Sequence, residues 1–373
     1  MSGAVKGWCP GAHRPMLSGD GLVVRVRPRL GRLGLRQALG LCALAQFHGS
    51  GVIDLTSRAN LQIRGVSEAA HAGLLDGLAA LELLDASAEA ERRRNILVSP
   101  FWQAEDLTVR LTRALTAALP DMPDLPAKVG FAVDTGAAPL LGGASADFRF
   151  ERSASGLILR ADGAAAGRAV TEAEAIPALL EMVRWFDAHR TPERRRMAGV
   201  LARSVLPRGW NVVPPLPAAD LPEPGLRPEG ALIGAAFGQL DAAALAEVLT
   251  ASGAAAIRLT PWRMLLLEGG ALPGPGRFVT AAGDPFLAVD ACPGAPLCSA
   301  ATVETRPLAR ALARRLEGTL HVSGCAKGCA RRRAARRTLV GRDGRFDLIE
   351  NGCAGDAPCR TGLTPDDLAI GVP

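Results

Sequence analysis

The sequence predicts an α+β fold: a two-fold pseudo-symmetric ferredoxin-like domain, made by an internal duplication, joined to two α/β domains. A short repeat is the first observation, because residues 53–56 and 257–260 read Ile-Asp-Leu-Thr and Ile-Arg-Leu-Thr. The second is that each copy follows a strand-like run and a helix-like run, and precedes another strand. Strand, helix, strand, strand, repeated once, is the order of two ferredoxin-like halves.

The elements of the two halves correspond in order. Residues 21–27 and 231–237 have the apolar pattern of strands, and residues 35–47 and 242–250 have that of helices. The pentapeptides Leu-Gln-Ile-Arg-Gly and Leu-Leu-Leu-Glu-Gly then follow the two copies at the same spacing. A match this short also arises by chance, and the family resemblance described below supports the duplication.

A proline-rich stretch separates the two halves. Residues 205–230 hold seven prolines, from Pro207 to Pro228. Because proline fixes its own φ and lacks an amide donor, this stretch is expected to be a semi-rigid connector and not part of a sheet or helix.

The remaining segments predict two α/β domains. Asp106 is the expected N-cap of a helix over residues 107–119, and residues 128–134 and 171–189 predict a strand and a second helix. After the second half, we expect a helix over residues 299–316 and then a strand over residues 320–322. The predicted units are the first half at 1–88, the first α/β domain at 89–203, the connector at 204–230, the second half at 231–284 and the second α/β domain at 285–373.

Four cysteines in the last unit have the spacing of a metal centre. Cys292 and Cys298 have five residues between them, and after a gap of 26 residues Cys325 and Cys329 have three between them. Neighbouring glycines let backbone approach a bulky inorganic group, and four thiolates from two loops are what a [4Fe–4S] cluster needs. Structural zinc sites usually space their paired ligands by about two to four residues, so the five-residue gap disfavours zinc. Inert buried thiols are the remaining alternative.

The cysteines outside this set of four predict no second metal centre. Cys353 and Cys359 repeat the five-residue spacing, but no second pair completes a set of four ligands. Cys42 falls within an apolar helical run, where a core position is expected.

Five arginines between 331 and 337 directly follow Cys329 and predict the solvated face of a helix. An anionic substrate or an electron donor is the alternative partner of these arginines.

Three further motifs, together with the cysteines, resemble one family. Residues 56–62 read Thr-Ser-Arg-Ala-Asn-Leu-Gln, residues 94–97 Arg-Asn-Ile-Leu and residues 125–128 Leu-Pro-Ala-Lys. In this order, and followed by Cys-x5-Cys and Gly-Cys-x3-Cys, they resemble the sulfite and nitrite reductase superfamily over nearly the whole chain. The resemblance implies that the first motif lies against a tetrapyrrole, that the core is a duplication, and that the two α/β domains are cofactor domains.

Within that superfamily, three stretches resemble the precorrin-3B synthase family of the aerobic cobalamin pathway. They are Gly-Trp-Cys-Pro-Gly at 7–11, Asp-Ala-Cys-Pro-Gly-Ala-Pro at 290–296 and His-Val-Ser-Gly-Cys-Ala-Lys-Gly-Cys-Ala at 321–330. Siroheme reductases more often have Gly-Cys-Pro-Asn-x-Cys, and they carry a second lysine after the Leu-Pro motif. This chain has Ala-Lys at 326–327 and Gly130 at those places, so siroheme is not expected.

The resemblance implies an oxygen-dependent monooxygenase that hydroxylates precorrin-3A at a meso carbon and closes a lactone with a neighbouring acetate side chain. It also implies a mononuclear non-haem iron beside the [4Fe–4S] cluster, although the five histidines show no ligand pairing at helical spacing. Cys9, within one of the resembling stretches, is a candidate for contact with the active site. A siroheme-dependent sulfite or nitrite reductase, or an electron-transfer or cluster-carrier protein, are the alternatives.

Four cations are predicted to bind the substrate. Arg58, Arg94 and Lys128 fall on the family motifs, and a precorrin carries many carboxylates, which an arginine fork binds in bidentate fashion. Arg64 joins them through strand alternation alone, because period two places it on the same face as Gln62. For each cation the alternative is a solvated surface position. A large basic pocket would disfavour a simple electron carrier.

Composition agrees with an enzyme that binds an anionic small molecule. The 373 residues carry a formal net charge of +6, and 48% of them are hydrophobic. The chain has no tyrosine, only 4% aromatic residues and no recognisable nucleic-acid-binding motif, and no apolar stretch is long enough to span a bilayer. Without a recognisable export signal or dinucleotide-binding motif, we expect a cytoplasmic protein that is reduced by an external electron donor.

Overall fold

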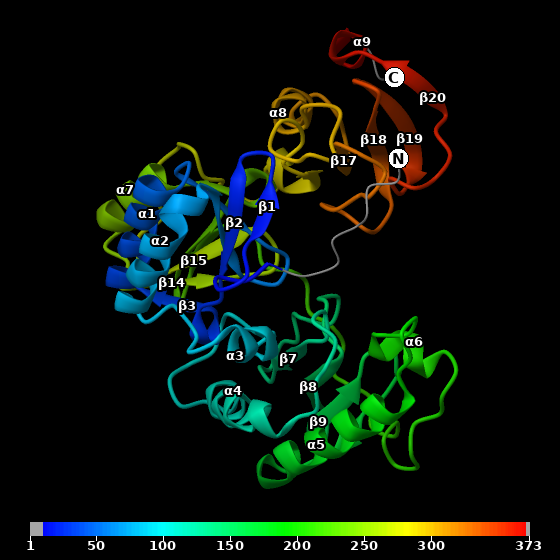
Figure 1. Cartoon of the computed structure of the whole chain (residues 1–373). Helices are drawn as coiled ribbons and strands as arrows, with labels where there is room; N and C mark the ends of the chain where they lie inside the picture. The colour runs from blue at the N-terminus through cyan, green and yellow to red at the C-terminus, as the bar shows by residue number, and fades with distance from the viewer. Residues whose placement is uncertain (1–9, 371–373) are drawn as a thin grey trace.

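Four five-stranded sheets organise the chain. The computed structural model describes residues 10–370, and Figure 1 shows a blue and yellow-green centre, a green domain and an orange-to-red domain. Two of the sheets form the centre, and each of the other domains contains one. The predicted α+β class, with a duplicated ferredoxin-like core and two α/β domains, is confirmed.

The two central sheets are copies of one another. Their strands are β1 Met16–Ser18, β2 Gly21–Val26, β3 Arg32–Gly34, β4 Val52–Leu55 and β5 Leu61–Val66, and then β11 Gly225–Arg227, β12 Gly230–Gly234, β13 Gln239–Asp241, β14 Ala256–Leu259 and β15 Met264–Glu268. The first sheet has the order β1-β2-β5-β4-β13 and the second β11-β12-β15-β14-β3. Each half therefore contributes one short strand to the sheet of the other half, which joins the two halves.

The copies also agree in backbone conformation. The turns before the exchanged strands hold Leu30 and Phe237 at φ 56° and 61°, and the β4–β5 and β14–β15 turns hold Ala59 and Arg263 at φ 50° and 62°. A left-handed conformation costs a residue other than glycine roughly 1–2 kcal/mol. Its recurrence at matching places shows that these turns belong to the repeated unit.

Three helices cover the central sheets. They are α1 Leu35–His48, α2 Glu68–Ala80 and α7 Ala242–Ser252, and the first and last agree closely with the helices predicted over 35–47 and 242–250. Leu41, Leu74 and Leu249, one from each helix, are buried in a single hydrophobic core to which both halves contribute. The halves therefore share one core and form one domain.

The first α/β domain contains a sheet of order β10-β9-β8-β7-β6. Asp106 caps the second of its helices by accepting a hydrogen bond from the Val109 amide at 2.9 Å, as predicted, and Thr171 caps the third. The strand expected from residue 128 begins at Phe131. The elements are α3 Ala88–Arg93, β6 Ile96–Val98, α4 Leu107–Ala118, β7 Phe131–Asp134, β8 Phe148–Ser153, β9 Gly156–Ala161, β10 Arg168–Ala169, α5 Glu172–His189 and α6 Met197–Leu201.

The proline-rich connector follows the surface of the first α/β domain. Val213 forms a single bridge with Gly167, and the Leu216 amide donates to the Arg152 carbonyl at 2.7 Å. The last residues of the predicted connector already form β11. None of the helices within residues 10–370 is long and apolar enough to cross a membrane.

The second α/β domain contains a sheet of order β16-β17-β18-β19-β20, in which the first three strands are parallel. Its helix α8 packs against β16 and β17, and leucines from this helix and from the sheet form the core. The elements are β16 Val289–Ala291, α8 Arg306–Ala313, β17 Leu320–Ser323, β18 Ala335–Arg342, β19 Arg345–Gly352, β20 Arg360–Leu363 and α9 Pro365–Ile370.

Two sequence predictions for this domain are wrong. The helix expected over 299–316 begins only at Arg306 and ends at Ala313, because the preceding residues use their backbone to hold the cysteine-bearing loops. The arginine run at 331–337 is not a helix face: residues 331–334 are irregular, and Arg336 and Arg337 lie in β18. Its first arginine, Arg331, is mostly buried and pairs with Asp290 at 2.9 Å.

Candidate active site

The four predicted cysteine ligands lie in two loops at one edge of the last sheet. The first cysteine loop, residues 292–298, follows β16, and the second, residues 325–329, follows β17. Because β16 and β17 are parallel neighbours, their carboxyl ends meet at the same edge. Chain segments separated by 26 residues are thereby brought together.

Backbone contacts hold the two cysteine loops against each other. The Gly324 amide donates to Cys292 Sγ at 3.2 Å, and the Thr302 amide donates to the Gly324 carbonyl at 3.1 Å. A Cβ added to Gly324 would lie 2.5 Å from the Ala301 side chain, so only glycine fits there. Within the first loop, the Cys298 amide donates to the Gly294 carbonyl at 2.8 Å. The glycines that the sequence singled out are needed for this close approach.

The four thiols lie within electrostatic reach of one another. Burial raises the pKa of the Cys329 thiol, and the thiols of Cys325, Cys292 and Cys298 raise it further, while Lys327 lowers it. Thiolates that repel in this way are stabilised when they ligate cationic iron or zinc.

The chemistry of the four thiols bears on which group they could hold. Among residues 10–370, no three cysteine, histidine or acidic side chains are grouped so that they could hold a metal ion. Sulfurs on one tetrahedral zinc stand about 3.8 Å apart, because each Zn–S bond is about 2.3 Å. In a [4Fe–4S] cluster each thiolate binds a different iron, which spreads the sulfurs further apart. Four thiolates drawn from two loops are the kind of donor set that a [4Fe–4S] cluster uses.

A buried histidine lies beneath the second cysteine loop. His321, on β17, is fully buried, and its Cε1 atom would lie 3.6 Å from a Cβ built on Gly328. Neither ring nitrogen has a hydrogen-bond partner in the part of the chain that the structure describes. Burial lowers the pKa of His321 to about 4, against the opposing effect of Asp290 and with the help of Arg331. The ring is therefore neutral at physiological pH.

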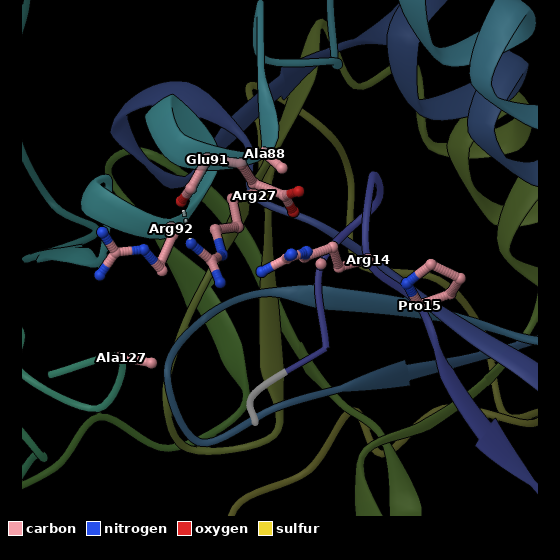
Figure 2. Close-up of a pocket in the computed structure, with 8 residues that line it drawn as sticks. Arg14, Pro15, Arg27, Ala88, Glu91, Arg92 and Ala127 are labelled. Carbon is pink, nitrogen blue, oxygen red and sulfur yellow. Dashed lines mark hydrogen bonds between the residues drawn. The ribbon is translucent and has the colours of Figure 1, made fainter. Parts of the chain in front are cut away.

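A basic cavity of about 440 Å³ opens where the central domain meets the first α/β domain. Figure 2 shows Arg14 and Arg27 extending toward the same space, with Glu91 above and Ala127 on a facing loop. The walls come from the N-terminal segment, the end of β2, helix α3 and the Leu-Pro motif. The lining residues are Gly11, Arg14, Pro15, Arg27, Ala88, Glu91, Arg92 and Ala127.

Arg27 is the most strongly perturbed cation of the cavity. Its residue is only 7% exposed, and burial lowers its pKa to about 10, with further lowering by Arg25 and Arg94. One guanidinium nitrogen donates to the Glu91 carbonyl, whereas Nε has no partner among the described residues. The cavity thus holds a desolvated cation, whose charge an anionic ligand would stabilise.

Glu91 fixes the N-terminal segment at the cavity wall. Its carboxylate accepts hydrogen bonds from the Ala12 amide at 2.7 Å and the His13 amide at 3.2 Å. A Cβ on Gly11 would lie 2.5 Å from that carboxylate, so glycine is required at this position. This carboxylate is occupied by the chain itself and leaves the arginines as the ligand-facing charges.

Two of the predicted substrate cations lie beside the cavity. Arg58 Nη2 donates to the Lys128 carbonyl at 3.0 Å and to Ser145 Oγ at 3.2 Å, which connects the β4–β5 turn to the Leu-Pro motif. Lys128 is exposed, and it directly follows Ala127, which lines the cavity. Arg58 and Lys128 therefore occupy neighbouring positions at the rim.

The other two predicted cations bind carboxylates of the chain. Arg94 forms a bidentate pair with Asp85, at 2.9 and 2.7 Å, and both side chains are about nine-tenths buried. Arg64 is 4% exposed and binds Asp20 and Asp54 at 2.7 and 3.3 Å. Their guanidinium groups are engaged within the fold.

The remaining sequence predictions can also be located. Cys42 is buried in α1, as predicted, and burial raises the pKa of its thiol to about 12. Cys353 follows β19, and Cys359 precedes β20 and donates its amide to the Leu348 carbonyl. Cys9 lies outside the described residues.

A side chain at Gly130 would require Asn95 to move. A Cβ there would lie 2.8 Å from the Asn95 side-chain nitrogen, which itself donates to the Val129 carbonyl at 2.7 Å. The Gly130 carbonyl also accepts the amides of two residues at the start of β8. The departure from the reductase motif is therefore built into the local packing.

Sequence reasoning missed the cavity arginines Arg14, Arg27 and Arg92. One signal was available for Arg27, because Arg25 and Arg27 alternate at the end of a strand that is otherwise apolar. Arg92 stands two residues before the motif arginine Arg94. Only the fold brings them to the same cavity.

Comparisons with known proteins agree with this architecture. Residues 14–81 match the nitrite/sulfite reductase ferredoxin-like half domain. The Mycobacterium tuberculosis NirA protein has a similar fold, with a TM-score of 0.63 and 19% identity, over 94% of this chain and 79% of that chain. The duplicated core thus resembles the ferredoxin-like core of sulfite and nitrite reductases.

A second comparison, with a curated relative, shows the family of this chain. A precorrin-3B synthase from Sinorhizobium sp is 31% identical over 397 residues, covering 95% of this chain and 84% of the relative. The chain belongs to the precorrin-3B synthase family and is an enzyme of the oxidoreductase type, as the motifs predicted.

Proposed function

We propose that this enzyme converts precorrin-3A to precorrin-3B with dioxygen. One oxygen atom becomes a hydroxyl on a meso carbon and the other leaves as water, which consumes two electrons and two protons from an external donor. The double bond between the meso carbon and the neighbouring ring carbon is consumed, because the acetate carboxylate adds to that ring carbon and closes the lactone. The observation that carries the proposal is the basic cavity, at the junction of the duplicated core and the first α/β domain, in a chain of this family.

The cavity arginines would bind the carboxylates of the precorrin. Arg27 is a desolvated cation, and Arg14 adds positive charge on a second wall. Arg92 adds charge on a third wall, where its guanidinium also pairs with the exposed Asp124. A charge-assisted hydrogen bond in such surroundings is worth about 1.5–3 kcal/mol. Arg58 and Lys128 would contact substrate that extends beyond the rim. We assign Arg94 and Arg64 to holding the fold of the site, because both already bind carboxylates of the chain.

We propose that Cys292, Cys298, Cys325 and Cys329 bind one [4Fe–4S] cluster. The shared sheet edge, the glycine-permitted loop contacts and the mutual electrostatic effect of the thiols support this set. Such a cluster supplies single electrons. The family also implies a mononuclear non-haem iron, but residues 10–370 contain no group of three histidine, cysteine or acidic side chains that would identify its ligands.

The electron demand of the reaction and the thiols of the cluster site also bear on the electron donor and the cellular compartment. Two electrons per turnover must come from a separate reductase or ferredoxin-like protein, because no dinucleotide-binding motif is recognised in the sequence. A reducing compartment keeps the four thiols available for the cluster, and we therefore propose the cytoplasm.

The optical spectrum and metal content of anaerobically purified protein test this assignment. We expect a broad brown absorbance, about four irons and four sulfides per chain from the cluster site, and no siroheme bands. Cys325→Ser should abolish the cluster absorbance, and Cys359→Ser, on the same domain, is the matched control that should retain it. Stoichiometric siroheme in protein from a siroheme-producing host would favour a sulfite or nitrite reductase.

A further inference from the structure

A buried ionic network joins the duplicated core to the first cysteine loop. Its centre is Arg64 on β5, whose residue is only 4% exposed. Nε and Nη2 of Arg64 donate to the two oxygens of Asp20 at 2.9 and 2.7 Å. Nη1 reaches Asp54 at 3.3 Å. The guanidinium is thus fixed in orientation by two carboxylates on separate strands and turns.

Asp54 links Arg64 to a second arginine from the other domain. Its second oxygen accepts from Arg306 Nη2 at 2.7 Å, and Arg306 is 7% exposed at the start of α8. The residue before it, Thr305, donates its hydroxyl to the Cys292 carbonyl. Asp54 therefore bridges the core to the segment that holds the first cysteine ligand.

The same network contacts the residue beside the second ligand. The Leu297 carbonyl accepts three hydrogen bonds, from Arg64 Nη2 at 3.1 Å, Ser18 Oγ at 2.5 Å and the Gly19 amide at 3.1 Å. Cys298 follows Leu297 directly. A Cβ on Gly19 would lie 1.9 Å from the Pro296 carbonyl oxygen, so the hairpin after β1 rests directly on the first cysteine loop.

This arrangement is poorly suited to stability alone. Two arginines and two carboxylates are withdrawn from water. Proteins in which such buried ion pairs are replaced by well-packed apolar groups of similar size are often as stable or more stable. Arg306 also keeps Nε and Nη1 without partners among the described residues. The network instead fixes the position of the Leu297 carbonyl, next to Cys298, through three directional hydrogen bonds.

We propose that Arg64, Asp54 and Arg306 are positioning residues for the [4Fe–4S] cluster. They hold the first cysteine loop at a set place relative to the core, so that Cys292 and Cys298 remain in register with the second cysteine loop. The inference rests on the proposed cluster, and it gives Arg64 a role toward the cluster and not toward the substrate.

The test compares two buried arginine pairs. Asp54→Asn removes the bridging charge while keeping its shape, and Ser18→Ala removes one contact to Leu297 with little effect on folding. The control is Glu151→Gln, which breaks the mostly buried bidentate pair with Arg160 in the first α/β domain, at 2.6 and 2.8 Å. Each protein is purified anaerobically with its cluster, and its folding is checked by circular dichroism.

The readout is the rate of cluster loss to an iron chelator, followed by absorbance, together with the electron paramagnetic resonance spectrum of the reduced cluster. Asp54→Asn should lose its cluster at least about tenfold faster than the unaltered protein, and Ser18→Ala about threefold faster, because charged contacts are worth more than neutral ones. Glu151→Gln should match the unaltered protein. If Asp54→Asn fails to fold, the Ser18→Ala rate decides.

The outcomes separate this inference from the proposed function. Equal rates and spectra in the network variants and in Glu151→Gln would overturn the positioning role while leaving the cluster in place. Absence of any cluster from the unaltered protein would instead overturn the proposed cofactor.

Discussion

Replacing Arg27 by methionine should weaken substrate binding without weakening the fold. The pKa of Arg27 falls from 12.5 to about 10, chiefly through burial. One pKa unit corresponds to about 1.4 kcal/mol, so the charged guanidinium is disfavoured in the free protein by about 3 kcal/mol. Arg27→Met removes that penalty and retains most of the apolar stem, at the cost of one hydrogen bond to the Glu91 carbonyl.

The two effects of Arg27→Met should have opposite signs. A lost hydrogen bond costs about 1 kcal/mol, so the free energy of unfolding should stay unchanged or rise by up to about 2 kcal/mol. Affinity for precorrin-3A should fall by roughly ten- to a hundredfold, because a charge-assisted contact worth about 1.5–3 kcal/mol is removed. A residue that serves only the fold would show the reverse pattern.

Urea unfolding and anaerobic binding titrations with precorrin-3A, or a stable analogue, measure both effects. Arg113→Met is the matched control, since Arg113 is exposed, pairs with Glu105 at 2.8 Å and does not line the cavity. It should change neither quantity. An Arg27→Met protein that is destabilised by more than about 2 kcal/mol and keeps full affinity would refute the reasoning.

Three further predictions concern buried groups. Arg94→Ala should destabilise the protein by about 3 kcal/mol, measured by urea unfolding, because it leaves the Asp85 carboxylate buried and unpaired; an effect on substrate affinity alone would contradict this. Burial lowers the pKa of His321 from 6.5 to about 4. The contribution of His321 to the free energy of unfolding should therefore be full above pH 6.5 and fall by up to about 3 kcal/mol as the pH drops from 6.5 to 4, because acid protonates this histidine first in the unfolded chain. His321→Leu should remove that pH dependence, and an unchanged slope would show that other groups cause it. The Cys42 thiol, whose pKa burial raises to about 12, should resist iodoacetamide in the folded protein, whereas the exposed Cys359 reacts, as peptide mass spectrometry would show.

Local patterns were sufficient to predict the main elements of the fold. The helical run at 35–47 and the Asp106 cap needed only periodicity and side-chain chemistry, and the structure confirms both. The exchange of β3 and β13 could not be predicted in this way. Each strand has three residues, and its partner lies about two hundred positions away, so no local signal specifies the pairing.

For a related reason, the sequence indicated which cysteines lie near one another but not what Arg64 and Arg94 bind. Cysteine spacing is a local pattern, and the parallel strands β16 and β17 place the two pairs in loops at the same edge of the sheet. The partners of Arg64 and Arg94 are carboxylates whose proximity depends on the tertiary fold, so strand alternation and motif matching could not reveal them. The helix expected from residue 299 failed because the tertiary contacts of the cysteine loops override helical propensity there.

Single-turnover oxidation with isotopically labelled dioxygen would decide whether this enzyme is a monooxygenase that acts on precorrin-3A. Protein that carries its cluster would be mixed with precorrin-3A and a low-potential electron donor, and the products would be resolved by mass spectrometry. We expect a precorrin heavier by one labelled oxygen atom, formed only with dioxygen, with the second labelled atom in water. Unaltered precorrin-3A, together with reduction of added sulfite or nitrite by the same protein, would contradict the proposed function.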